Sequence, residues 1–326
     1  MRFFITGISG FAGRHLATHL LESGHWVGGI ARQDGALDEL RSRCGGPLAS
    51  AAIDACYIRD RAGLRGALER ARPDGVFHLA AVTFVPKTIE QPGLAYEVNF
   101  LGTVELLSAV CEVAPRARVV LVTTGEVYGA IDPARDLPVV ETQPLRPLSP
   151  YSVSKAAADL AGFQTFWSQS LDVVRARPFN HTGPGQPPEF VCSEFARALV
   201  AAEIGVGPAT LRVGNLDVER DFSDVRDIVD GYVALFEKGR GGEAYNLGSG
   251  LATSVRTILE ELRFLGRTPV AVETDPRKLR PREIPRIVGS IDKIRETTAW
   301  RPRIPLRQTL TDLMDDWRSR LRGAAR

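Results

Sequence analysis

The sequence predicts an α/β fold, with a doubly wound parallel sheet in its first half and a smaller C-terminal α/β lobe. Short β-branched runs alternate with longer helical stretches, and a glycine-rich turn stands at the first strand–helix junction. Pro and Gly interrupt the chain after residue 178, and the later elements are shorter. Strand–helix alternation is typical of βαβ units, whose parallel sheet is covered by helices on both faces.

The predicted elements follow in order along the chain. We expect strands at 3–6, 26–31, 49–53, 76–79, 118–123 and 172–176, separated by helices at 11–23, 61–71, 94–113 and 151–169. Later helices are expected at 190–204, 225–237, 254–265 and 305–321, and the segment 242–250 is expected to return to the sheet. The expected division is a first domain of 1–178 plus 223–246 and a second lobe of 179–222 plus 247–326.

The composition is that of an ordinary soluble protein. Among 326 residues, 44% are hydrophobic and 25% are charged, with a formal net charge of +2, so we expect neither a nucleic-acid nor a membrane partner. No apolar run approaches the roughly 20 residues that span a bilayer, and the N-terminus lacks a signal-peptide pattern. The four cysteines lie far apart without metal-ligand spacing, which favours a reduced cytoplasmic location and no metal.

The segment TGISGFAG carries the first motif with a chemical meaning. Gly7, Gly10 and Gly13 follow a predicted strand and open a predicted helix, with Ser9 and Phe11 between them. This spacing lets the backbone approach a pyrophosphate at the helix N-terminus. A plain tight turn is the alternative, but the position at the first strand–helix junction favours a dinucleotide site.

The end of the second predicted strand bears on the choice of dinucleotide. An acidic residue there would bind the ribose 2′-hydroxyl of NAD, whereas this strand ends with Ala31 and Arg32. Because a guanidinium suits a 2′-phosphate, we expect NADP(H). Asp34 could act as the acid in a shifted register, so NAD(H) stays the alternative.

Two further motifs place proton-transfer groups near the predicted sheet edge. Thr124 and Glu126 follow a buried apolar strand and would point the same way if its extended geometry persisted, although turn chemistry alone explains such residues. Tyr151 and Lys155 in YSVSK are four apart, on one face of a predicted helix. An ammonium beside a phenol lowers the phenol pKa toward a useful range, whereas a surface Tyr–Lys pair is the alternative.

These motifs together resemble the extended short-chain dehydrogenase/reductase family over essentially the whole chain. HLAA at 78–81 resembles the family's fourth-strand motif, and RPFNHTGPGQ resembles the segment that joins its lobes. The resemblance implies a Rossmann-type NADP-binding domain, a nucleotide-sugar-binding lobe and a catalytic set of Thr124, Tyr151 and Lys155. It further implies cofactor contacts at Asp54, Leu79, Ala80, Ala81, Asn99, Pro178 and His181.

Two branches of that family compete. In nucleotide-sugar 4,6-dehydratases a Thr-x-Glu at this place takes a proton from sugar C5, which would make Glu126 a base. The segments 213–229 and 279–290 look most like GDP-6-deoxy-D-lyxo-4-hexulose reductases, which make GDP-D-rhamnose and are relatives of GDP-mannose 4,6-dehydratase. Gly125 replaces the Ser or Asp that dehydratases place between Thr and Glu, so the reductase is favoured and Glu126 would orient the substrate.

The resemblance also implies the substrate contacts and the assembly. A GDP-sugar would be bound by Thr83, Val85, Glu126, Asn180, Arg220, Arg280 and Glu283, and a surface ion pair is the alternative for the charged ones. A homodimer or homotetramer is implied through two helices carrying Leu101, Val104, Leu107 and Leu160. A nucleotide-sugar 4-epimerase and a non-catalytic NADP-binding sensor or scaffold stay as further alternatives.

Overall fold

The computed structural model describes residues 1–32, 47–279 and 283–324 of the chain. Its centre is a parallel seven-stranded sheet in the order β10-β6-β5-β4-β1-β2-β3. The strands of this sheet are β1 Arg2–Thr6, β2 Trp26–Ala31, β3 Ala52–Ala55, β4 Gly75–His78, β5 Arg118–Val122, β6 Val173–Pro178 and β10 Ala244–Leu247. The expected doubly wound parallel sheet is confirmed, and so is the return of 242–250 to it.

Helices cover both faces of this sheet, and the strands show why. Phe3 and Ile5 of β1 pack with one apolar core, whereas Phe4 between them packs with the other. Successive strand residues point to opposite faces, so an apolar run needs a cover on each side. One face is covered by α1 Phe11–Glu22, α9 Val225–Lys238 and α11 Asp292–Thr298, the other by α3 Arg61–Ala71, α6 Gly102–Val113 and α7 Pro150–Gln169.

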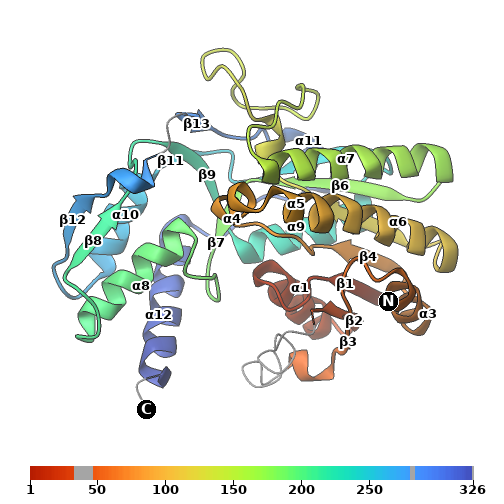
Figure 1. The fold of residues 1–326 in the computed structure, drawn as a ribbon, viewed down its shortest axis with the longest axis horizontal. Helices are drawn as coiled ribbons and strands as arrows, with labels where there is room; N and C mark the ends of the chain where they lie inside the picture. The colour runs from red at the N-terminus through yellow and green to blue at the C-terminus, as the bar shows by residue number, and fades with distance from the viewer. Residues whose placement is uncertain (33–46, 280–282, 325–326) are drawn as a thin grey trace.

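The second unit lies beside the sheet, on the left in Figure 1, and has its own apolar core. It contains the helices α8 Val191–Glu203, α10 Val255–Leu265 and α12 Leu306–Ala324 and the strands β7 Asn180–Thr182, β8 Thr210–Val213, β9 Glu219–Asp224, β11 Ala252–Ser254, β12 Ala271–Thr274 and β13 Arg286–Ile287. Some residues of the expected second lobe pack with the first unit. Ile294 and Trp300 pack in the first unit's core, and the Trp300 indole donates to Asp227 O at 3.0 Å.

Three local predictions need correction. The strand expected at 49–53 is found later in the chain, as β3 Ala52–Ala55, and a 3₁₀-helix, Pro47–Ser50, precedes it. The helix expected at 94–113 is three pieces: α5 Pro92–Ala95, a π-helix Tyr96–Leu101 and α6. The remaining short helices are α4 Val85–Glu90 and the 3₁₀-helices Gly125–Tyr128 and Pro276–Lys278.

The third correction concerns membrane-spanning length. The stretch Pro92–Val113 has 22 residues and is, by length and composition, long and apolar enough to span a membrane. Half of its most apolar part is buried inside the protein. Its contacts with α3 and α7 place it in the fold as a helix that covers the sheet. Trp300 and Trp317 are buried.

Candidate active site

The site lies at the carboxyl ends of the central strands, where the strand order reverses between β1 and β4. Thr6 of β1 pairs in register with His78 of β4, so the turns after both strands meet at this point. Gly7 has φ +72°, and a Cβ on it would lie 2.8 Å from Ala80 N. Only glycine therefore lets the first turn pack against the second.

The glycine turn fits an anionic dinucleotide. A Cβ on Gly13 would lie 2.1 Å from Gly7 O, so the helix start and the turn are in direct contact. Gly10 is the N-cap of α1 and forms no side-chain cap hydrogen bond, which leaves the first N–H groups of the helix directed at a ligand. Ser9 and Phe11 flank this cap, as the motif predicts.

Thr124 and Glu126 reach the site by a different geometry from the one expected. The extended conformation ends at Thr124, which caps a 3₁₀-helix and accepts a hydrogen bond from Glu126 N at 3.2 Å. Thr124 is buried and Glu126 is exposed, so the two side chains do not share a strand face. Both act on Tyr151, since burial and then the Glu126 charge raise its pKa while the hydrogen bond with Thr124 lowers it.

Tyr151 and Lys155 lie on the first turns of α7, which begins sharply. Ser149 is the N-cap in a capping box with Ser152, and Pro150 occupies the first helical position. Lys155 Nζ donates to Val122 O at 2.7 Å, at the end of β5. Burial lowers the pKa of Lys155 to about 8, and the Asp159 charge opposes this change.

A buried ion-pair cluster supports this end of the sheet. Asp159, one turn beyond Lys155, accepts from Arg177 Nη2 at 2.8 Å and Nε at 2.9 Å, and pairs with Arg175. Thr123 Oγ1 donates to the same carboxylate at 3.2 Å. Asp159 thus links α7 to the ends of β5 and β6, directly before Thr124. Sequence analysis missed this residue, although its spacing of four from Lys155 was a usable signal.

Asn99 differs from its expected role as a cofactor contact. It is fully buried in the π-helix, where its Oδ1 accepts from Val82 N at 2.7 Å and its Nδ2 donates to Val82 O at 3.0 Å. The second Nδ2 hydrogen is donated to Ser154 Oγ at 3.0 Å. Asn99 is therefore a positioning residue for the loop after β4, which carries Leu79, Ala80 and Ala81.

The other expected cofactor residues are spread around the sheet edge. Arg32 is exposed directly after β2, and Asp34 lies outside the described residues. Asp54 of β3 pairs with Arg70 Nη2 at 3.0 Å. His181 is stacked with Phe11, their ring centroids 6.0 Å apart, and Pro178 ends β6 nearby.

Only some of the expected substrate-binding residues lie close to one another in the structure. Arg220 Nη2 lies 3.9 Å from Glu283 Oε1, so β9 and the segment before β13 bring these two predicted groups together. Asn180 is exposed on β7, which pairs with β9. Thr83 and Val85 lie at the start of α4, and Arg280 lies outside the described residues.

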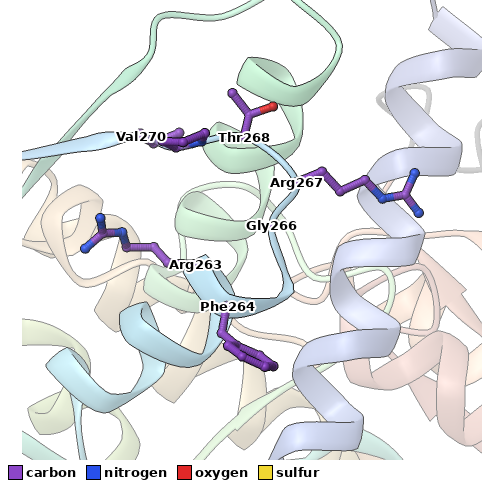
Figure 2. Close-up of a pocket in the computed structure, with 7 residues that line it drawn as sticks. Arg263, Phe264, Gly266, Arg267, Thr268 and Val270 are labelled. Atoms are coloured by element: carbon purple, nitrogen blue, oxygen red, sulfur yellow. The ribbon is translucent and has the colours of Figure 1, made fainter.

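A surface pocket of about 360 Å³ lies elsewhere, at the C-terminal end of α10. Figure 2 shows the Arg263, Phe264 and Arg267 side chains pointing in different directions, whereas a binding pocket has converging polar groups. Within the described residues, no group of three or more His, Cys, Asp or Glu side chains could hold a metal ion.

Comparison with known proteins agrees with this geometry. A sequence model described as GDP-mannose 4,6 dehydratase matches residues 4–313. The GDP-6-deoxy-D-mannose reductase of Pseudomonas aeruginosa is 34% identical, over 98% of this chain and 98% of its own.

Two solved structures are similar over nearly their full length. RMD from P. aeruginosa complexed with NADPH gives a TM-score of 0.83 at 30% identity, covering 98% of this chain and 100% of its own. The Thermus thermophilus UDP-glucose 4-epimerase complexed with NAD gives a TM-score of 0.86 at 28% identity, covering 98% of this chain and 99% of its own. The chain therefore belongs to the GDP-mannose 4,6-dehydratase family, within the nucleotide-sugar epimerases, dehydratases and reductases of the short-chain dehydrogenase/reductase type.

Proposed function

We propose that the protein is an NADPH-dependent reductase of a nucleotide-linked 4-keto-6-deoxyhexose, most closely GDP-4-dehydro-6-deoxy-D-mannose, which it converts to GDP-D-rhamnose. The full-length similarity to a GDP-6-deoxy-D-mannose reductase supports this assignment. The family also contains dehydratases, so a structural feature of the site has to decide between the two reactions.

The packing of Phe179 against Gly125 carries the proposal. A Cβ on Gly125 would lie 2.9 Å from each of three Phe179 ring atoms. The ring is held from two further sides, since it stacks on Tyr128 and a Cβ on Gly289 would lie 2.2 Å from it. The site therefore leaves no room at position 125 for the Ser or Asp expected to assist loss of the C6 hydroxyl in a dehydratase.

The residues of the site suit reduction of a ketone. Thr124 accepts from Glu126 N and lies beside Tyr151, so the two hydroxyls are placed to donate to one carbonyl oxygen. The raised pKa of Tyr151 keeps its proton available for transfer to O4 as that oxygen gains charge. The expected lowering of the Tyr151 pKa by Lys155 is not seen, because burial and the Glu126 charge raise that pKa and Lys155 Nζ donates to Val122 O instead. When bound, NADPH supplies the hydride that C4 receives.

The cofactor is assigned from this chain's own residues. The tight contact of Gly7 and Gly13 and the uncapped start of α1 fit a pyrophosphate. Arg32, exposed after β2, suits a 2′-phosphate, which favours NADP(H) over NAD(H). NADPH and NAD dissociation constants, measured by fluorescence, test this choice. Arg32→Ala should weaken NADPH binding and leave NAD binding unchanged, and equal weakening of both would contradict the assignment.

A dehydratase is the second candidate, because Glu126 is close enough to raise the Tyr151 pKa and could reach sugar C5. The test uses the purified protein with GDP-mannose, alone and then with a known GDP-mannose 4,6-dehydratase and NADPH. NADPH consumption only in the coupled reaction supports the reductase. A 4-keto product from GDP-mannose alone makes the protein a dehydratase, and NADPH binding without turnover on any nucleotide sugar supports a sensor.

A homodimer completes the proposal. The outer faces of α7 and the π-helix expose apolar side chains, with Leu160 58% and Trp167 77% exposed. Leu101 and Val104 are also exposed, but Leu107 is buried in the core and is excluded from this face. Light scattering tests the assembly: Leu160→Glu should give monomers, whereas Val206→Glu, at a 64% exposed position of the second unit, should not. A monomeric parent protein would contradict it.

A further inference from the structure

A chain of buried hydrogen bonds joins the glycine turn to the catalytic helix. His78 Nδ1 lies 2.6 Å from Thr6 Oγ1, directly before Gly7, and His78 Nε2 lies 2.8 Å from Thr103 Oγ1 on α6. Thr103 Oγ1 donates a hydrogen bond to Asn99 O at 2.6 Å, and Asn99 Nδ2 donates one to Ser154 Oγ on α7. All of these side chains are at most 1% exposed, so water cannot replace any of the bonds.

The direction of each bond follows from counting protons. The Thr103 hydroxyl has one hydrogen, which it donates to Asn99 O, so it must accept from His78 Nε2–H. His78 Nδ1 is then unprotonated and accepts from Thr6 Oγ1–H. Thr6 in turn accepts from Ala80 N at 3.2 Å. The whole chain is satisfied by one tautomer of His78, the neutral Nε2–H form.

The far half of the chain is ordered in the same way. Asn99 Nδ2 donates to Val82 O and Ser154 Oγ, and Ser154 donates onward to Tyr151 O at 2.7 Å. Thr103 donates to the carbonyl four residues before it, as helical threonines often do, so the hydroxyl joins the π-helix to His78. The loop after β4 is thus fixed at Ala80 from the glycine turn and at Val82 from the π-helix.

We propose that His78 is a positioning residue which, held as the Nε2–H tautomer, fixes the dinucleotide turn and the Tyr151 helix relative to each other through this directional chain. The inference holds for any hydride-transfer reaction at this site and does not rest on the choice between reductase and dehydratase. A protonated imidazole would leave Thr6 facing a donor, so the neutral form is required throughout the working pH range. Burial lowers the pKa of His78 to about 3, and the Lys155 charge acts in the same direction.

The tautomer is tested directly by ¹⁵N NMR of the histidine-labelled protein between pH 8 and pH 5. The His78 signals are expected to show a protonated Nε2, an unprotonated Nδ1 and no titration. An Nδ1–H tautomer for His78, or titration within this range, would overturn the proposal. Assignment uses loss of the signal in His78→Gln. Where that variant fails to fold, the Nε2–H correlation to the Thr103 methyl group assigns the signal in the unsubstituted protein.

Two isosteric variants separate the halves of the chain. In His78→Asn the amide oxygen can replace Nδ1 and keep the hydrogen bond from Thr6, but the shorter side chain cannot donate to Thr103. We therefore expect kcat to fall about tenfold while NADPH affinity is unchanged. In His78→Gln the amide nitrogen can replace Nε2 and keep the hydrogen bond to Thr103, while the Thr6 hydroxyl loses its acceptor. We therefore expect NADPH affinity to fall about tenfold while kcat is unchanged. Equal changes in both quantities, or no change in either, would contradict a positioning role.

Thr103 supplies a rescue and a control. Thr103→Val should reproduce the His78→Asn loss, and Thr103→Ser should restore kcat because it keeps the hydroxyl. Thr165→Val makes the same substitution at a buried α7 threonine that bonds Ala161 O of its own helix, so its kcat should be unchanged. Equal losses in Thr103→Val and Thr165→Val would point to general destabilisation and overturn the inference.

Discussion

The Phe179 ring occupies the space that a side chain on Gly125 would need, with three ring atoms each 2.9 Å from the position of a Cβ. Gly125 is not in the left-handed backbone region, so its conformation alone does not require glycine. The requirement comes from a residue that is 54 positions away in the sequence. Because Gly125 separates Thr124 from Glu126, this contact shapes the part of the site where reductases and dehydratases differ.

Gly125→Ala should therefore lower the free energy of unfolding by about 1–3 kcal/mol, as overpacking does. Gly93→Ala is the matched control, since a Cβ there meets nothing within 4 Å, and it should be neutral or slightly stabilising. Urea denaturation measures both. Adding Phe179→Leu to Gly125→Ala should recover part of the loss, and strictly additive effects would show that the ring is not the cause.

Tyr151→Phe removes the proton donor without removing the ring. We expect kcat of the coupled reaction to fall by about 10²–10⁴, the usual contribution of a positioned acid, while NADPH affinity is kept. Stopped-flow absorbance at 340 nm and fluorescence titration measure the two quantities. Retention of most of the turnover would remove Tyr151 from the proposed mechanism.

Glu126→Gln separates the two candidate reactions. In a reductase Glu126 only orients the sugar, so KM for the sugar should rise with kcat kept within about tenfold. In a dehydratase it is the C5 base, and kcat should fall by about 10² or more. Product formation followed by NMR, with GDP-mannose and with the 4-keto sugar, distinguishes these outcomes.

Acid should destabilise the protein through its buried histidines. Burial is the largest cause lowering the pKa of His15, His78 and His181, so their unfolded forms bind protons below about pH 6.5 while the folded forms stay neutral. Stability then rises with pH in this window and is lost as pH falls. His78 alone should account for about 2 kcal/mol between pH 7 and pH 5. Denaturation at both pH values measures it, and an unchanged midpoint would contradict neutral burial.

Much of the fold was predictable because it rests on local patterns. Short β-branched runs predicted strands within a few residues of β1, β2, β4, β5 and β6, and helical spacing predicted α1, α3 and α7. The predicted placement of Tyr151 and Lys155 on one helix face follows from helix geometry alone, and both lie on α7. The strand expected at 49–53 was placed too early, since β3 is Ala52–Ala55, because a short apolar run does not distinguish the start of a strand from a 3₁₀ turn.

The role of Asn99 could not be predicted in the same way. The motif placed it near the cofactor, but its hydrogen bonds go to Val82 and Ser154, on two other elements. A helical pattern over 94–113 likewise does not reveal a π-helix, because the widened turn is stabilised by partners outside the helix, such as the loop after β4.

The sequence by itself determined the alternation of strands and helices, the glycine turn and the spacing of the proposed catalytic residues, since each depends on residues within a few positions of one another. Only the tertiary structure decided that Phe179 closes the space at Gly125, that Asp159 braces the end of β5, and that His78 joins two parts of the site. Those contacts link segments that the order of the strands and the packing of the helices bring together. There the volume of one side chain, or the number of hydrogens it can donate, constrains a second side chain far away in the sequence.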